Sequence, residues 1–286
     1  MICTSLMTLL LSLAGCGSTG SDSISLLDSA PDSLKDSAPD SQPETGFSDG
    51  LNWPGEEWEI GDPESLGVDT SALEALRAYL FQEAHNTQAL VVIKDGLLVG
   101  EWYTEGKDKD SLVTSWSIAK SVLSAIVGVG LREDILTLDD PVSKTVPEWS
   151  IGSNKDVTIR DLLEMRSGMD ANWSNPNGVY SVITDQLEYS LARNVQWSPG
   201  QTFHYVNEDS MVLGEVVAKS FGEDFQTIAD REILSPIGLD GVWWKDAADH
   251  TLSYCCIDTT ARALARFGLL YSRNGAWKDQ QIVPES

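Results

Sequence analysis

A polar turn that runs directly into an apolar helix, at residues 111–131, constrains the fold of this chain more than any other stretch. The aliphatic residues of the helix surround nearly its whole circumference: Ile118, Val122, Leu123, Ile126, Val127, Val129 and Leu131. A helix that is apolar on all sides is buried inside a domain. Ser117 stands at the helix start and Lys120 follows three residues later, so their side chains share one face. The stretch therefore predicts a buried central helix that presents a hydroxyl and an amine together.

This Ser117–Lys120 pair can be a nucleophile and its base. A lysine amine with an ordinary pKa of about 10.4 is protonated at neutral pH, but desolvation can lower its pKa by several units and free its lone pair. The helix N-terminus also favours negative charge developing at Ser117. The alternative is a helix-capping serine followed by a lysine that extends to solvent, and the spacing alone does not separate the two interpretations.

The charge of the chain excludes one class of partner. The net charge is −25, and residues 17–66 contribute −11 of it through twelve acidic residues and one lysine. Such a surface repels phosphate backbones, so nucleic acid is not expected as a partner. With 286 residues and 42% hydrophobic content, the chain can hold one large domain or two small ones with a real core.

The N-terminal sixteen residues resemble a bacterial lipoprotein signal peptide. An apolar run too short to span a bilayer ends in Leu13-Ala14-Gly15-Cys16, although no Lys or Arg precedes the run. We expect lipidation at Cys16, export, and anchoring to the membrane through the lipid, at the outer membrane, in the periplasm or at the cell surface. The alternative is a disordered apolar end.

Residues 17–52 predict a disordered tether rich in Ser, Asp and Pro. The segment Asp28–Ser33 recurs as Asp36–Ser41, and the stretch has too few apolar residues to bury a core. The folded domain is expected over 53–286.

Local patterns within this domain predict an α/β fold that is not doubly wound. A capping box at Ser71 and Glu74 predicts a first helix, and Asp95-Gly96 predicts the turn of a hairpin between 90–93 and 97–99. Further helices are expected after Thr158, which forms a capping box with Asp161, and at 208–221, 223–234 and 259–273. The irregular polar stretch 169–200 is expected to form a wall of a site.

Cysteine and histidine positions give no metal site and no cofactor is expected. Cys255 and Cys256 could form a vicinal disulfide, but two buried thiols are the favoured interpretation. The histidines are His85, His204 and His250, and without a Gly-x-Ser-x-Gly elbow a Ser-His-Asp triad is not expected.

A second motif, Tyr205-x-Asn207, follows the Pro199-Gly200 turn downstream of Ser117-x-x-Lys120. Together with three sequence segments, the one around Ser117 and those at 158–168 and 260–268, this motif resembles the serine hydrolases of the penicillin-recognising superfamily. The closest likeness is to the class C-type β-lactamase-related proteins, which include esterases and aminohexanoate-dimer hydrolases. The resemblance covers roughly 53–286.

This resemblance implies a β-lactamase/transpeptidase-like fold, with an antiparallel sheet flanked by helices and a helical insertion. It implies that Ser117 is the nucleophile, Lys120 its base, Tyr205 a proton relay and Asn207 a substrate contact. The implied activity is hydrolysis of a small ester or amide through an acyl-enzyme. A non-catalytic binding or sensor domain, or an inactive truncated product, is the alternative. Relatives continue past residue 286 into strands that carry a third motif, so those strands are expected to be missing. The hairpin at 89–103 should then have an unpaired edge and a bare apolar face.

Overall fold

The computed structural model describes residues 51–170 and 183–285, which fall within the unit Asp49–Ser286. The expected signal peptide at 1–16, its lipidation site Cys16 and nearly all of the tether lie outside the described residues, as do residues 171–182 of the expected wall stretch. Within the described ranges, no helix combines the length and the apolar character needed to cross a membrane.

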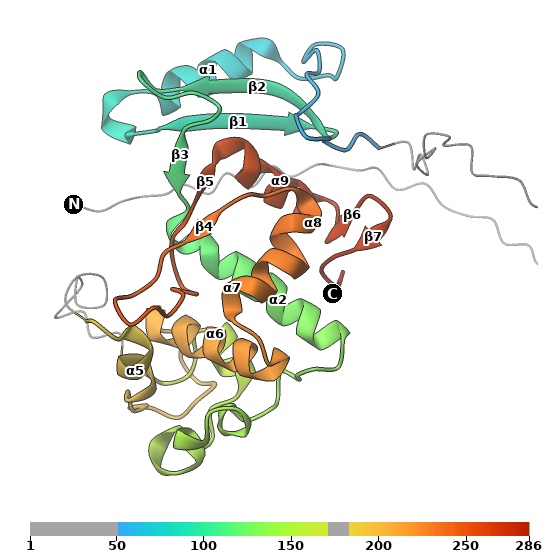
Figure 1. The fold of residues 1–286 in the computed structure, drawn as a ribbon. Coiled ribbons are helices and arrows are strands. Elements are labelled where there is room, and N and C mark those ends of the chain that lie inside the picture. Colours follow the sequence, from blue (N-terminus) through green and yellow to red (C-terminus); the bar gives the residue numbers. More distant parts are fainter. Residues whose placement is uncertain (1–50, 171–182, 286) are drawn as a thin grey trace, which may run out of the picture. The chain divides into compact units, whose positions relative to one another are not determined.

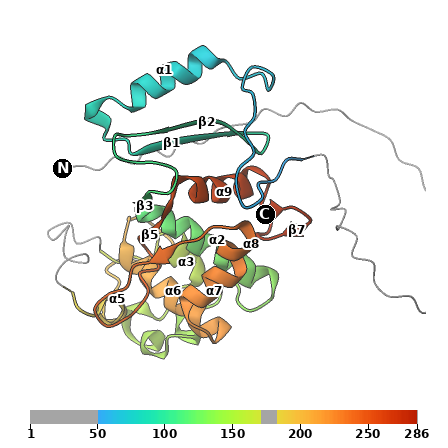
Figure 2. The same ribbon diagram turned by 45° about the horizontal axis from the view of Figure 1, so that its top comes forward.

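The hairpin has the predicted turn. Strand β1 (Ala89–Lys94) pairs antiparallel with β2 (Leu97–Tyr103), and both turn residues, Asp95 and Gly96, have positive φ. Figures 1 and 2 both show the hairpin between helix α1 (Thr70–Leu80) and helix α9 (Ala261–Ser272). The α9 helix packs against β1, and Leu98 is buried in the main core. The expectation of a bare apolar face was therefore wrong, because α9 covers it.

The outer edge of β2 pairs with another segment only at one isolated bridge. A short bridge forms where the Gly61 N–H donates to the Leu98 carbonyl at 3.0 Å and the Leu98 N–H donates to the Glu59 carbonyl at 2.9 Å. Within 51–170 and 183–285, the sheet that contains the hairpin has β1 and β2 as its only strands, so the outer edge of β1 has no strand partner there.

The start of α1 differs from the prediction. The N-cap is Asp69, whose side chain accepts from the backbone N–H groups of Ser71 and Ala72. The expected Ser71–Glu74 capping box was wrong because the aspartate two residues earlier already satisfies these free N–H groups. The capping box of Thr158 and Asp161 is confirmed at the start of α3 (Ile159–Leu163).

The predicted central helix is α2 (Ala119–Arg132), which follows the 3₁₀ turn η2 (Trp116–Ile118). Most of its aliphatic side chains are buried, but Leu131 is only partly buried and Ile118, in the turn before the helix, is exposed. The helix contacts α6 (Asn207–Phe221), α7 (Phe225–Ala229) and the π-helical segment η6 (Asp230–Leu234). Figure 1 shows α2 running through this group of helices. The remaining elements complete the same body: η1 (Glu83–His85), η3 (Val142–Lys144), η4 (Pro147–Ser150), η5 (Gly152–Asn154), α5 (Gln186–Leu191), α8 (Ser235–Ile237), β6 (Ala276–Trp277) and β7 (Gln280–Gln281).

A second small sheet leads the chain into α2. Its order is β3 (Leu112–Thr114), β5 (Ile257–Thr260) and β4 (Val242–Trp243), with antiparallel pairing throughout. Thr114 lies opposite Asp258, so the segment just before β5 runs beside the turn that holds Ser117. The fold is an α/β fold of antiparallel sheets flanked by helices, as the resemblance implies.

Candidate active site

The structure brings Ser117, Lys120 and Tyr205 together. Ser117 is exposed in the 3₁₀ turn before α2, and its Oγ lies 3.2 Å from Lys120 Nζ, one helical turn away. Tyr205, from the loop before α6, donates its hydroxyl to the same Oγ at 2.7 Å. One oxygen that faces solvent is therefore in contact with both a potential base and a potential proton relay.

Burial changes the chemistry of Lys120. Desolvation lowers the pKa of its amine from 10.5 to about 7, so a large fraction is neutral near physiological pH. The Tyr205 and Tyr254 rings lie 5.1 and 5.3 Å from Nζ, and the Tyr254 carbonyl accepts a hydrogen bond from Nζ at 2.6 Å. A neutral amine 3.2 Å from a serine hydroxyl can take up its proton.

The backbone at Ser117 is held in an unusual conformation. The preceding residue, Trp116, has φ of 48°, a left-handed value that is an outlier for a bulky side chain. The Cys256 N–H donates to the Trp116 carbonyl at 3.1 Å, and the Ile257 N–H donates to the Ser115 hydroxyl at 2.8 Å. Such strain persists only where the surroundings fix it, and it clusters at functional sites.

The segment that carries Tyr205 and Asn207 is held in place by contacts of the neighbouring residue His204. The His204 N–H donates to the Met165 carbonyl at 2.9 Å, and the His204 ring stacks on Trp197 at a centroid distance of 4.7 Å. Asn207 is half-buried as the first residue of α6, two residues after Tyr205.

Two exposed aromatic side chains, Trp116 and Phe203, lie within two residues of Ser117 and Tyr205 in the sequence. Trp116, next to Ser117, is 48% exposed, and its ring lies 6.4 Å from that of Trp244. The Trp244 indole donates to Asp258 at 2.9 Å, and Phe203, near Tyr205, is 62% exposed. Trp244 and Tyr254 were not predicted, because only the pairing of β5 with β3 and β4 brings them to the Ser117 turn.

The sulfur atoms of Cys255 and Cys256 lie in direct contact, so the vicinal disulfide that the sequence allowed is within reach. Both residues are buried, and Cys256 has a φ of 73°. Adjacency in the sequence could not show this left-handed turn, which depends on the contact of Cys256 with Trp116.

Asp185, Asp246 and His250 form a group that could hold a metal ion, with potential ligand atoms within 4.8 Å of one another. No metal site was predicted, because Asp185 lies far in the sequence from Asp246 and His250. Their atoms also bond within the protein. His250 Nδ1 lies 3.3 Å from Asp246 Oδ2, and Asp246 accepts the backbone N–H of Gln186 at 2.8 Å. These contacts tie the start of α5 to the 246–250 turn.

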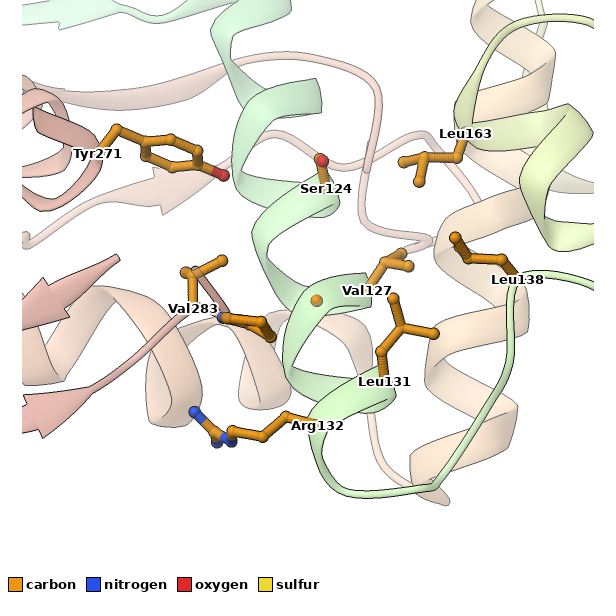
Figure 3. Close-up of a pocket in the computed structure, with 10 residues that line it drawn as sticks. Ser124, Val127, Leu131, Arg132, Leu138, Leu163, Tyr271 and Val283 are labelled. Carbon is orange, nitrogen blue, oxygen red and sulfur yellow. The ribbon is translucent and has the colours of Figure 1, made fainter. Parts of the chain in front are cut away.

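A separate apolar cavity of about 490 Å³ lies along α2 (Figure 3). Ser117, Lys120 and Tyr205 do not line this cavity. The residues that line it come from α2, α9 and other segments: Ser124, Val127, Gly128, Leu131, Arg132, Leu138, Leu163, Tyr271, Val283 and Pro284.

Comparison with known proteins places this geometry in a family. The Beta-lactamase family model matches residues 74–284. A proposed D-alanyl-D-alanine carboxypeptidase of Escherichia coli K12 is 24% identical over 208 residues, which cover 62% of this chain and 48% of the relative. Beta-lactamase-like protein 2 of Dictyostelium discoideum is 28% identical over 132 residues, covering 41% of this chain and 23% of that protein. The chain thus spans half or less of the length of these curated relatives.

A solved structure of a proposed 6-aminohexanoate-dimer hydrolase from Bacillus anthracis superposes with a TM-score of 0.66. Its sequence is 22% identical to this chain, and the match covers 74% of this chain and 60% of that one. At this identity the likeness shows the fold.

Proposed function

Because the chain belongs to the beta-lactamase family, whose members are hydrolases, we propose that it is a serine hydrolase that acts on a small ester or amide through an acyl-enzyme. The observation that carries the proposal is the contact of Ser117 Oγ with both Lys120 Nζ and Tyr205 Oη. A capping serine with a lysine in solvent would show neither the burial of the amine nor the second contact.

In the proposed reaction, neutral Lys120 takes the hydroxyl proton as Ser117 Oγ attacks the substrate carbonyl. The tetrahedral intermediate collapses when the bond to the alcohol or amine breaks, and Tyr205 donates its proton to that leaving group. Lys120 then returns a proton to Tyr205. In the second half-reaction water attacks the acyl-enzyme, and the proton passes back to Ser117. Asn207 is proposed to contact the acyl side of the substrate.

We propose a small substrate with an apolar group beside the carbonyl. The exposed rings of Trp116, Trp244 and Phe203 near the nucleophile support this choice, since aromatic faces bind apolar or flat groups. The carboxypeptidase and aminohexanoate-dimer hydrolase named among the similar proteins support an amide or ester carbonyl as the reacting group.

Turnover of p-nitrophenyl butyrate tests the proposal. We expect continuous release of p-nitrophenol by the wild-type chain and its loss in Ser117→Ala. A single burst that equals the enzyme concentration, with no steady phase, would indicate a sensor domain that acylates only once. Equal rates for both proteins would contradict the proposal.

We also propose that the chain is exported and anchored at Cys16, on the strength of the N-terminal sequence. Cys16→Ser should release the protein from the membrane fraction of expressing cells, and unchanged fractionation would contradict the anchor.

A further inference from the structure

We infer that Tyr254 and Gln186 are positioning residues that hold the base Lys120, an inference that rests on the proposed function. Their role would pass through the backbone carbonyl of Tyr254, which accepts from Lys120 Nζ at 2.6 Å. This is shorter than the 3.2 Å contact between Nζ and Ser117 Oγ, so the carbonyl and not the nucleophile is the nearer anchor of the amine.

Tyr254 is itself fixed at both ends. Its side chain is fully buried, and its hydroxyl donates to Gln186 Oε1 at 2.5 Å. The Gln186 backbone N–H donates to Asp246 Oδ2 at 2.8 Å, and Asp246 Oδ1 accepts from the His250 N–H at 2.9 Å. The tyrosine is therefore tied to α5, and α5 is tied back to the turn four residues before Tyr254.

This arrangement matters because a lysine side chain has many rotamers, and ordering it costs conformational entropy. The groups that face Lys120 Nζ are the Ser117 and Tyr205 side chains, the Tyr254 ring and the Tyr254 carbonyl. If the tie between Tyr254 and Gln186 is cut, the Tyr254 segment can move and admit water to the amine. Hydration returns the amine toward its ordinary pKa and leaves fewer neutral lysines at pH 7.

The test uses a fluorophosphonate probe, which reacts once with an activated serine. Ser117 Oγ forms a bond to phosphorus, the phosphorus–fluorine bond breaks, fluoride leaves, and Lys120 takes the proton. The rate of labelling is measured from pH 5.5 to 9.5 for wild type, Tyr254→Phe, Gln186→Leu and the double variant. Ser190→Ala is the control, because it removes a buried hydrogen bond of the same helix, from Ser190 Oγ to the Gln186 carbonyl at 2.7 Å, without touching Tyr254.

We expect both single variants to move the rise in labelling rate to higher pH. If the Lys120 pKa rises by one pH unit from about 7, the neutral fraction of the amine at pH 7 falls from about one half to about one tenth. The labelling reaction should then be about fivefold slower. The double variant should match the single variants, because all three cut one connection. Ser190→Ala should keep the wild-type pH midpoint.

A second readout works without activity. Titration of ¹³C-labelled lysine by NMR, with Lys120 assigned through Lys120→Arg, reports the Lys120 pKa directly. An unchanged midpoint in Tyr254→Phe by both methods, or a shift as large in Ser190→Ala, would overturn the inference. Failure of the wild-type chain to react with the probe would instead contradict the proposed function, and the NMR titration would still decide whether Tyr254 and Gln186 control the amine.

Discussion

Replacing Lys120 with methionine should make the protein more stable and inactive at the same time. Burial lowers the pKa of the amine from 10.5 to about 7. Below pH 7 the lysine is protonated in both states, so folding carries the full cost of a buried charge, about 5 kcal/mol from this difference in pKa. Methionine has a similar volume and avoids the cost. It also loses the contacts to Ser117 Oγ and the Tyr254 carbonyl, which offsets about 1–3 kcal/mol.

The net expectation at pH 6 is a gain of about 2–4 kcal/mol in the free energy of unfolding. The gain must depend on pH. Between pH 7 and 10.5 the unfolded chain binds a proton that the folded chain does not, so wild-type stability rises with pH in this window. At pH 9 the cost of the buried lysine has fallen to about 2 kcal/mol, and the advantage of Lys120→Met should shrink by about 2–3 kcal/mol.

Urea denaturation followed by tryptophan fluorescence at pH 6 and pH 9 measures both values. Lys155→Met is the matched control, because Lys155 is exposed. A stability difference between wild type and Lys120→Met that is the same at pH 6 and pH 9 would refute the assignment of a buried amine with a lowered pKa.

Two further variants test the surroundings of Ser117. Tyr205→Phe removes the hydroxyl that donates to Ser117 Oγ, and we expect p-nitrophenyl ester hydrolysis to fall about 10²–10⁴-fold with little change in melting temperature; a rate within twofold of wild type would show that Tyr205 relays no proton. Gly168→Ala places a Cβ 2.2 Å from the Trp197 carbonyl oxygen at a φ of 88°, so we expect the free energy of unfolding, measured with urea, to fall by more than about 1 kcal/mol. An unchanged free energy of unfolding would show that this loop is not rigid.

Local sequence signals were enough to predict the elements in which neighbours along the chain determine the structure. The apolar run after Ser117 predicted α2, Asp95-Gly96 predicted the hairpin turn, and the Thr158–Asp161 box predicted the start of α3. In each case the determining contacts lie within a few residues, so a pattern in one sequence contains them.

The sequence could not predict contacts that depend on distant segments. Tyr254 reaches Lys120 across 134 positions, because β5 pairs with β3 beside the turn that holds Ser117. The same pairing brings Cys256, whose φ is positive, to Trp116, where the Cys256 N–H donates to the Trp116 carbonyl. The packing of α9 against the hairpin was not predicted for a similar reason. The apolar face of a helix does not identify the sheet against which the helix packs.

Mapping the probe adduct by mass spectrometry tests the central claim most directly. The wild-type protein is treated with a fluorophosphonate at pH 8, its intact mass is measured, and its proteolytic peptides are sequenced by fragmentation. The account predicts one adduct per chain, located on Ser117, with labelling lost in Ser117→Ala and greatly slowed in Lys120→Met. An adduct on another residue, or labelling of Ser117→Ala at the wild-type rate, would contradict it.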